Sequence, residues 1–348
     1  MKKNIAFSIV VTAIAVLISC NKVDSTSPTG EDFSNPEPHS ILTKGVGEKT
    51  PSIICYVETN DVNPLNAGDY YFPNGETVID YVVLFASNIH KTLVGGVYQP
   101  TLYFNDKLTP YVLNADTYIT PLQDQNQAVL LGILGDWVDL GLSNMTTTQA
   151  EQLATIVAYA VGEYGFDGIS LDDEYSGNNV TPNNYSYSTF INKYRQLRPY
   201  DIIHVFDWGA TDTISSTAAA EINYAGHGYF GYYLTYNYSD ITGMNAAIWS
   251  PISLLLGQTY TMSELNTIQT WAANAKSNNY GQILLFNLRS SCPSDNNPVD
   301  PIPVFNRIAY GAGWITSPSS VTCSNGGRCP ATPVQGGYTI TYAMATGN

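Results

Sequence analysis

The 348-residue chain has few charged residues, and few of those are basic. Charged residues make up 12% of the sequence, with 14 Lys and Arg against 29 Asp and Glu, so the formal net charge is −15. No Lys/Arg-rich run follows Lys2 and Lys3. Because binding to a phosphate backbone needs such a positive footprint, nucleic acid is excluded as an expected partner.

Long apolar runs are also missing, apart from one between Ile5 and Ile18. This run is too short for a stable membrane span and follows two lysines, so it predicts an export signal over residues 1–19. Its end, "LISC", resembles a bacterial lipoprotein box, in which Cys20 would be lipidated and become the mature N-terminus. We therefore expect an exported monomer, held by a lipid anchor to the cell envelope at the outer membrane or cell surface.

Cysteine is scarce, with five in the chain. Export permits disulfides, and "CSNGGRC" can close a small loop between Cys323 and Cys329. No spacing of Cys20, Cys55, Cys292, Cys323 and Cys329 resembles a zinc site, so no metal centre is expected. Cys55, inside an apolar run, is typical of a buried thiol.

Composition divides the chain into four parts. After the export signal, residues 20–50 are rich in Ser, Thr, Pro, Gly and acids, which predicts a flexible tether. Residues 51–315 contain the apolar runs of a folded domain. Residues 316–348 are small and polar with a final apolar alternation, which predicts an appended loop and strand of unknown role.

Eight short apolar runs in residues 51–315 have the character of buried strands. They are 52–58, 79–87, 128–135, 167–172, 201–208, 222–230, 251–257 and 282–288. Near-continuous Val/Ile/Leu runs alternating with helical segments favour an α/β fold, a single (β/α)₈ TIM barrel. One such helix is expected over 146–165, opened by the capping sequence "TTTQ". A doubly wound open sheet remains the alternative, and 102–106 predicts an extra strand in a hairpin with the second run.

The stretch "YGFDGISLDDEYSG", residues 164–177, concentrates four carboxylates within eight positions. Side chains alternate along a strand, so Ser170, Asp172 and Glu174 share one face, while Ile169, Leu171 and Asp173 share the other. The apolar pair must face the surrounding helices, which directs the polar trio into the barrel and toward its C-terminal mouth. This alternation predicts that Asp172, rather than Asp173, faces the barrel mouth.

Asp172 and Glu174 lie about 6.5–7 Å apart at Cα on such a strand. Like charges this close raise one pKa, and a protonated Glu174 beside an ionised Asp172 is what a glycosidic general acid needs. The alternative is structural, because acids at a strand end also cap helices or bind a cation.

Several ordered segments resemble glycoside hydrolase family 18, and within it the endo-β-N-acetylglucosaminidases of the endoglycosidase H and F type. "FDGISLDDEY" resembles the DGxDxDxE signature of the family. Further similar segments are 56–72, 82–90, 102–106, 121–137, 224–233 and 283–288. The resemblance covers the chain from about Ile54 to Trp314 and implies no metal and no organic cofactor.

By this resemblance, Glu174 is the general acid/base, Asp172 orients the substrate's 2-acetamido group, and Tyr229 hydrogen-bonds the same group. The acetamide oxygen then attacks the anomeric carbon, so the protein supplies no nucleophile. Two positions depart from the family pattern. Ser170 replaces the middle aspartate and can hydrogen-bond to Asp172 without sharing a proton with it. "GHGYF" places His227 and Gly228 where Asn-Pro is expected by the resemblance, and His227 is either a substrate contact or an ordinary loop histidine.

Other residues near predicted strand ends are candidates for sugar binding. Aromatic side chains there can stack on sugars or simply pack, and polar ones can hydrogen-bond sugar hydroxyls. The aromatic candidates are Tyr70, Tyr71, Trp137, Trp208 and Tyr232, with Trp137 and Trp208 best placed; the polar ones are Asn88, Asp136, Asp207, Asn287 and Glu58. For Glu58 a salt bridge inside the barrel mouth is the equal alternative.

The sequence thus predicts hydrolysis of the β-1,4 bond in the N,N'-diacetylchitobiose core of N-linked glycans on glycoproteins. A chitinase acting on GlcNAc polymers is the alternative within the same class. A glycan-binding protein without turnover is the alternative from another class, motivated by Ser170 and "GHGYF".

Overall fold

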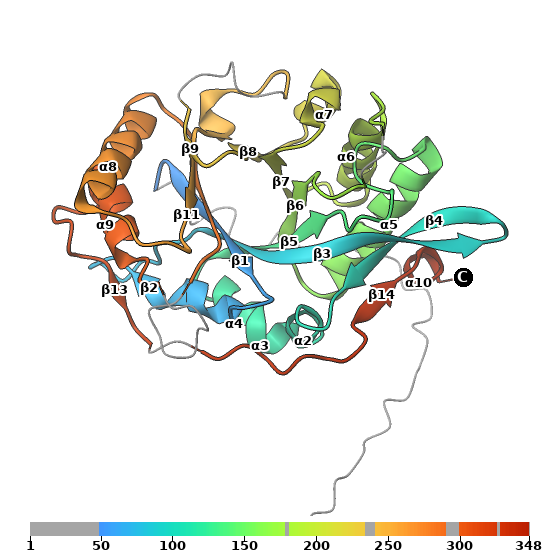
Figure 1. Cartoon of the computed structure of the whole chain (residues 1–348), viewed down its shortest axis with the longest axis horizontal. Coiled ribbons are helices and arrows are strands. Elements are labelled where there is room, and N and C mark those ends of the chain that lie inside the picture. The colour runs from blue at the N-terminus through green and yellow to red at the C-terminus, as the bar shows by residue number, and fades with distance from the viewer. Residues whose placement is uncertain (1–48, 178–180, 234–240, 290–298, 326–327, 348) are drawn as a thin grey trace, which may run out of the picture. The chain divides into compact units, whose positions relative to one another are not determined.

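Eight parallel strands form the central sheet of the structure, a computed structural model that describes residues 49–177, 181–233, 241–289, 299–325 and 328–347 (Figure 1). In chain order they are β1 (Ser52–Glu58), β3 (Tyr81–Val94), β5 (Ala128–Leu134), β6 (Gly168–Asp172), β7 (Ile202–Asp207), β8 (Tyr224–His227), a seventh strand in two pieces, β10 (Trp249–Ser250) and β11 (Ile252–Leu255), and β12 (Gln282–Phe286). Neighbours pair in this order, and β12 pairs with β1. The predicted (β/α)₈ barrel is confirmed, and the open-sheet alternative is excluded.

Pro251 divides the seventh strand. β10 pairs with β8 before it, and β11 pairs with β12 after it. Proline has no backbone N–H to donate to a ladder, so the strand changes partner at this residue. The short strand β9 (Gly231–Tyr232) runs antiparallel to β11, and Tyr233 N donates to Pro251 O at 2.8 Å.

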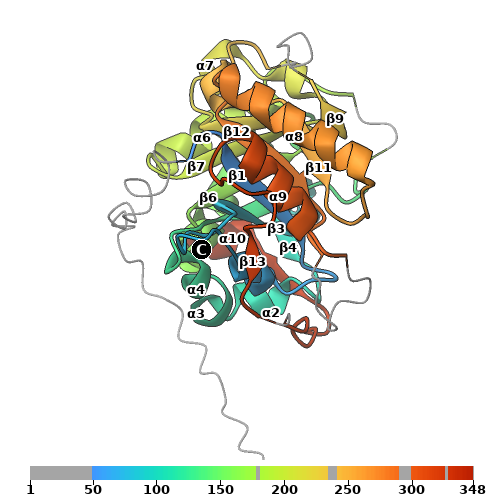
Figure 2. The same cartoon turned by 90° about the vertical axis from the view of Figure 1, so that its left-hand side faces the viewer.

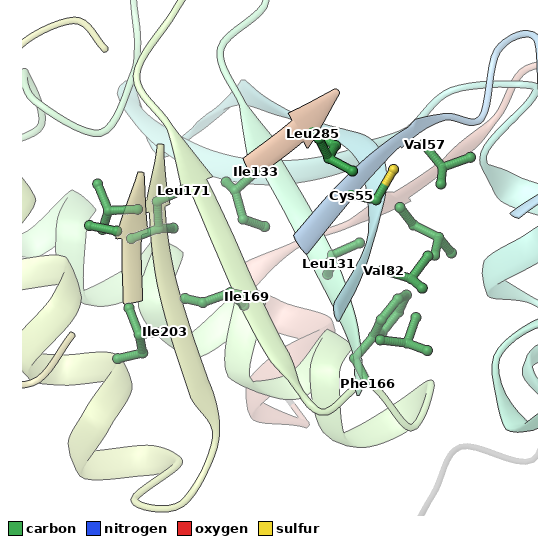
Figure 3. Packing of buried hydrophobic residues seen from close by; sticks show 14 of the residues in the cluster. Cys55, Val57, Val82, Leu131, Ile133, Phe166, Ile169, Leu171, Ile203 and Leu285 are labelled. Carbon is green, nitrogen blue, oxygen red and sulfur yellow. The ribbon is translucent and has the colours of Figure 1, made fainter. Parts of the chain in front are cut away.

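Alternate residues of each strand enter different cores. Ile53, Cys55 and Val57 of β1 belong to the large cluster between strands and helices, together with Ile169 and Leu171 of β6 (Figure 3). The residues between them on β1 enter a smaller cluster inside the barrel. This alternation follows from the strand period of two, and it fixes which side chains of each strand can reach the barrel mouth.

Four longer helices cover the outside of the barrel (Figures 1 and 2). They are α5 (Thr147–Glu163), α6 (Ser186–Leu197), α8 (Met262–Ser277) and α9 (Ile302–Gly311). The predicted helix over 146–165 is confirmed as α5, which begins with a capping box in which Thr146 and Gln149 satisfy each other's backbone N–H groups. α8 also begins with a capping box, which is formed by Thr261 and Glu264.

Two connections depart from a regular (β/α)₈ pattern. Only the 3₁₀ helix η1 (Pro64–Asp69) and the strand β2 (Tyr70–Tyr71) lie between β1 and β3. Between β8 and β10 the described residues form β9 and the 3₁₀ helix η4 (Ala246–Ile248). Two other connections contain short helices: α2 (Thr109–Val112), α3 (Ala115–Tyr118) and α4 (Thr120–Gln123) precede β5, and η2 (Thr211–Thr213) and α7 (Ser216–Ala219) precede β8.

The second barrel strand continues into a hairpin that projects beyond the barrel (Figure 1). β3 pairs antiparallel with β4 (Val97–Phe104) from Asn88↔Tyr103 to Val94↔Val97. The predicted hairpin strand is confirmed, but β3 is longer than the predicted run over 79–87. Its outer half carries polar residues, and an apolar run cannot reveal that part of a strand.

The C-terminal extension packs along the side of the barrel rather than forming a separate domain. β13 (Thr322–Cys323) pairs with β2, and β14 (Tyr338–Ile340) pairs with β4, before α10 (Tyr342–Thr346) packs near α5. Arg328 Nη1 contacts both carboxylate oxygens of Asp69 at 2.6 and 2.7 Å, and Asp69 is 2% exposed. Cys329 has a free thiol, so the predicted Cys323–Cys329 bridge is not formed.

The folded barrel begins slightly before the predicted boundary at residue 51. Lys49 Nζ lies 2.9 Å from Asp80 Oδ1 and donates to Val78 O at 2.6 Å. The export signal, Cys20 and most of the predicted tether lie outside the described residues. Among the residues that are described, no helix combines the length and apolar character needed to cross a membrane.

Candidate active site

The carboxyl end of β6 places Asp172 inside the barrel mouth. Asp172 ends the strand opposite Phe206 of β7, which belongs to the inner cluster. Ile169 and Leu171 point the other way, into the outer core (Figure 3). The structure therefore confirms the direction of the β6 side chains that was predicted from the sequence.

Asp172 is a buried carboxylate among other acids. It is 4% exposed, and its Oδ1 has no hydrogen-bond partner among the described residues. Burial raises the pKa of Asp172 well above its ordinary value, and the charges of Glu174, Asp173 and Glu58 raise it further. A buried acceptor without a donor costs free energy, so this oxygen is suited to a donor that arrives with a ligand.

Glu174 follows β6 and is half-buried. Its backbone oxygen accepts from Gly135 N at 3.2 Å, which ties this turn to the end of β5. Burial raises the pKa of Glu174, and a hydrogen bond with the Tyr175 side chain lowers it in part. The expectation of one raised and one ordinary carboxyl needs correction: both pKa values are raised, that of Asp172 more strongly, because Asp172 is the more deeply buried.

Asp173 faces away from the mouth, as its phase predicted. Its carboxylate accepts from the backbone N–H groups of Ser143 and Ala210, both at 3.3 Å, and from Ser176 Oγ at 3.4 Å. These bonds hold the loops after β5 and β7 to the end of β6. Asp173 thus supports the site without entering it.

Ser170 lies two residues before Asp172 on the same face of β6. Its hydroxyl contacts two other polar side chains that also contact each other. Its Oγ is 2.6 Å from Tyr56 Oη and 3.1 Å from His204 Nδ1, and Tyr56 Oη is also 3.1 Å from that nitrogen. Burial lowers the pKa of His204 to about 3, so the ring is neutral. The Ser170 hydroxyl was expected to hydrogen-bond to Asp172, but it contacts Tyr56 and His204 instead. These two residues were not identified from the sequence as part of the site.

Glu58 ends β1 on the inward face. Burial raises its pKa to about 7, and the charge of Asp61 adds to the rise, while Arg289 and the Asn60 side chain oppose it. Arg289 Nη2 lies 3.1 Å from Asp61 Oδ2. The salt bridge expected in the mouth therefore pairs Arg289 with Asp61, beside Glu58.

Tyr229 stands at the mouth in the turn after β8. Its side chain is 55% exposed, and its ring centroid lies 4.6 Å from that of Trp208, which follows β7 on the inward face. β8 is two strands from β6 in the sheet, so the backbones of these two strands lie about 10 Å apart.

His227 is not a surface residue of the mouth. Its side chain is 2% exposed, and its Nδ1 accepts from Tyr229 N at 2.9 Å. Strand β8 ends here, earlier than the predicted 222–230, because this hydrogen bond turns the chain. The structure thus does not place His227 as a substrate contact.

The predicted polar candidates are divided between the mouth and other places. Asn88 Nδ2 donates to Gly135 O at 3.1 Å, at the point where β3 begins to pair with β4 and just beyond the carboxyl end of β5. Asn287 follows β12 with φ 56°, and its Oδ1 has no partner among the described residues. Asp207 points outward from β7 and accepts from Thr211 Oγ1, so it is not brought together with Asp172 and Glu174.

An exposed aromatic pair lies beyond the ends of β5 and β6. Trp137 and Tyr175 have ring centroids 5.3 Å apart, and Trp137 N donates to Tyr175 O at 2.5 Å. Both have left-handed backbone conformations, with φ 55° and 57°, which is uncommon for non-glycine residues. Asp136 pairs with His90 Nε2 at 2.6 Å. The aromatic pair of Trp137 and Tyr175 lies beside Glu174, where a sugar ring could stack. Sugar binding by Trp137 and Asp136 stays a prediction.

The remaining aromatic candidates pack elsewhere. Tyr70 is buried edge-on against Phe305, and the Tyr71 hydroxyl donates to Gln125. Tyr232 stacks on Trp271, which belongs to α8. Their positions are those of packing residues, the alternative that the sequence left open.

Sequence reasoning missed Tyr56, His204 and His90. Tyr56 and His204 share the inward phase of Glu58 and Trp208, so the period-two argument used for β6 would have found them on β1 and β7. His90 lies in the part of β3 that the apolar run did not cover. Among the described residues, no group of three or more His, Cys, Asp or Glu side chains is arranged to hold a metal ion.

Comparison with known proteins identifies relatives along most of the chain, although no family model matches it. An endo-β-N-acetylglucosaminidase of Flavobacterium sp. (strain SK1022) is 33% identical over 293 residues, covering 82% of this chain and 85% of the relative. Endo-β-N-acetylglucosaminidase F1 of Elizabethkingia meningoseptica is 28% identical over 232 residues, covering 62% of this chain and 68% of the relative.

Solved structures agree on the fold. EndoBT-3987 of Bacteroides thetaiotamicron, in complex with Man9GlcNAc2Asn substrate, has a TM-score of 0.62 at 24% identity, over 85% of this chain and 72% of that chain. Its complex with Man5GlcNAc product gives 0.59 at 24% identity, over 83% of this chain and 66% of that one, just under two thirds. At this identity the likeness shows the fold alone. The sequence relatives go further: the chain is a glycoside hydrolase and belongs to the endo-β-N-acetylglucosaminidases of glycoside hydrolase family 18.

Proposed function

We propose that this hydrolase cleaves the β-1,4 bond of the N,N'-diacetylchitobiose core of N-linked glycans and leaves one GlcNAc on the protein. The substrate's own acetamide oxygen attacks the anomeric carbon, and the configuration is retained. The relative at 33% identity bears the name of this activity, and EndoBT-3987 binds a Man9GlcNAc2Asn substrate on the same fold.

The observation that carries the proposal is the unpartnered Oδ1 of Asp172. An acetamido group brings one N–H donor and one carbonyl oxygen. An N–H donated to Asp172 removes the desolvation cost of that oxygen and favours the ionised carboxyl. The ionised form then stabilises the positive charge that develops as the acetamide oxygen bonds to the sugar carbon.

Glu174 is assigned the proton transfers. Its raised pKa keeps the carboxyl protonated to higher pH than an ordinary glutamate, so it can donate to the leaving glycosidic oxygen. The resulting carboxylate then takes a proton from the water that opens the oxazolinium intermediate. Tyr175, hydrogen-bonded to Glu174, holds the carboxyl in place through both steps.

Tyr229 is assigned the orientation of the acetamido group. Tyr229 is exposed and would reach a sugar from the side of β8, while Asp172 would reach the same sugar from β6. Trp208 lies against the Tyr229 ring and limits its rotation. Two contacts on opposite sides hold the acetamide oxygen near the anomeric carbon, which is the geometry that intramolecular attack requires.

Glu174→Gln tests the assignment directly. This variant keeps the size of the side chain but has no proton to transfer, so release of free glycan from a denatured high-mannose glycoprotein is expected to fall about 10³-fold. Glu151→Gln, an exposed change on α5, is the matched control and is expected to retain full activity. Undiminished release by Glu174→Gln would remove Glu174 from the chemistry. Chitin oligomers run in parallel distinguish glycan-core cleavage from chitinase activity.

We also propose that the protein is exported as a monomer and held to the cell envelope by a lipid on Cys20. The support is the sequence pattern of residues 1–20. Detergent-phase partition of the protein from cells, compared with a Cys20→Ala variant, tests the anchor. Recovery of both proteins in the aqueous phase would contradict it.

A further inference from the structure

The turn after β8 is held at two consecutive residues. Gly228 N donates to Asp207 O at 3.0 Å, and a Cβ at position 228 would approach that oxygen to 2.6 Å. The next backbone N–H, that of Tyr229, donates to His227 Nδ1 at 2.9 Å. The path of the backbone at Tyr229 is therefore set by the neighbouring strand on one side and by an imidazole on the other.

The imidazole of His227 is itself fixed. Its ring stacks on Tyr233, with centroids 4.1 Å apart and planes 6° from parallel, and it lies 5.2 Å from the Tyr229 ring. Because Nδ1 accepts a hydrogen bond, the ring is neutral and carries its proton on Nε2. Burial lowers the pKa of His227 to about 4, which keeps this acceptor available through the neutral range.

The Tyr229 side chain is 55% exposed, so its position depends strongly on how its backbone is held. Among the described residues, its ring contacts Trp208 at 4.6 Å and His227 at 5.2 Å between ring centroids. A tyrosine in this state keeps its hydroxyl in place only as well as its backbone is held. A shift of about 1 Å at a group that aligns reacting atoms can lower the rate by up to about 10².

We infer that His227 is a positioning residue: without touching substrate, its Nδ1 holds the Tyr229 backbone so that the Tyr229 hydroxyl meets the acetamido group held by Asp172. The inference rests on the proposed function, in which Tyr229 orients that group. It assigns to His227 a role in alignment, and it explains why a buried histidine can occupy this turn.

Two substitutions test separately the hydrogen-bond acceptor and the aromatic ring of His227. His227→Asn keeps an acceptor, because an asparagine side chain can bond the backbone N–H two residues on, but it loses the stack on Tyr233. His227→Phe keeps an aromatic ring for the stack and loses the acceptor. His227→Phe is expected to lower kcat about tenfold or more with little change in KM, and His227→Asn to stay within about threefold of the wild type.

A double-mutant cycle with Tyr229→Phe shows whether His227 acts through the tyrosine hydroxyl. In the Tyr229→Phe background, His227→Phe is expected to cost less than about twofold, because the group that it positions is already gone. A loss as large as in the wild-type background would overturn the inference, as would equal activity of His227→Phe and wild type. His227→Gln, whose oxygen lies one bond too far, replaces His227→Phe if the latter does not fold.

The failure of the inference can be told from the failure of the proposed function. If the wild-type protein releases no glycan from any glycoprotein, the proposed function fails. If the wild type is active, Tyr229→Phe is impaired and His227→Asn is as poor as His227→Phe, only the positioning role fails. Thermal unfolding of each variant, compared with wild type, confirms that the rates compare folded proteins.

Discussion

Replacing Glu58 with Gln perturbs the buried charge of the barrel mouth at one residue. In the folded protein, burial and the charge of Asp61 raise the pKa of Glu58 from 4.5 to about 7, despite the opposing effects of Arg289 and Asn60. At about 1.4 kcal/mol per tenfold change in proton affinity, this rise corresponds to about 3 kcal/mol. The folded state thus favours the protonated carboxyl by this amount relative to the unfolded chain.

The sign of the pH dependence follows. Because the folded pKa is the higher one, the stabilising contribution of Glu58 is fully present below the unfolded pKa and is lost as pH rises through about 7. Gln cannot ionise and avoids this loss. The free energy of unfolding of Glu58→Gln minus that of wild type is therefore expected to increase by up to about 3 kcal/mol between about pH 5 and about pH 8.

Urea unfolding followed by tryptophan fluorescence at a series of pH values measures this difference. Taking the difference between two proteins cancels the titration of distant carboxylates that they share. Glu151→Gln, on the exposed face of α5, is the control, and its difference from wild type is expected to stay flat. A flat difference for Glu58→Gln, or one that decreases with pH, would refute the reasoning from burial.

Three further predictions concern Asp172, Ser170 and Arg328. Asp172→Asn removes the charge that stabilises the acetamide in the transition state, so kcat is expected to fall at least 10²-fold; turnover within tenfold of wild type would contradict the substrate-assisted step. Ser170→Asp buries a carboxyl against Tyr56, so its free energy of unfolding in urea at neutral pH is expected to fall by about 3 kcal/mol; a variant as stable as wild type would contradict this. Arg328→Met leaves Asp69 buried without its cation, and a loss of about 3 kcal/mol is expected by the same assay; an unchanged unfolding midpoint would mean that Asn325, which also bonds Asp69, suffices.

The eight strands and the inward face of β6 were predictable because each depends on a local pattern. A strand buried on both faces reads as a continuous apolar run, and its alternation fixes which residues point inward. Asp172 and Asp173 differ in direction for this reason alone, and the structure keeps them apart as predicted.

The missed parts depend on residues that are distant in the sequence. The period of two directs both Ser170 and Tyr56 inward, but their hydrogen bond joins residues 114 apart in the sequence, and no local pattern predicts that contact. The end of β8 was misplaced because a side chain, His227, takes the hydrogen bond that would have continued the strand. The relative rise of the two pKa values depends on burial depth, which becomes known only when the strands are assembled.

The C-terminal extension has a consequence for the order in which the chain is made. The described residues of 322–340 cover η1, β2 and β4, all of which leave the ribosome more than 200 residues earlier, and within the described part of the chain Arg328 is the cation that pairs with Asp69. Until residues 322–340 emerge, the first quarter of the barrel wall lacks the cation that pairs with Asp69 and has an uncovered sheet edge at β4. We therefore expect the emergence of these residues from the ribosome, rather than completion of β12, to be the moment at which the nascent protein becomes resistant to protease, and ribosome-stalled chains of increasing length would reveal it.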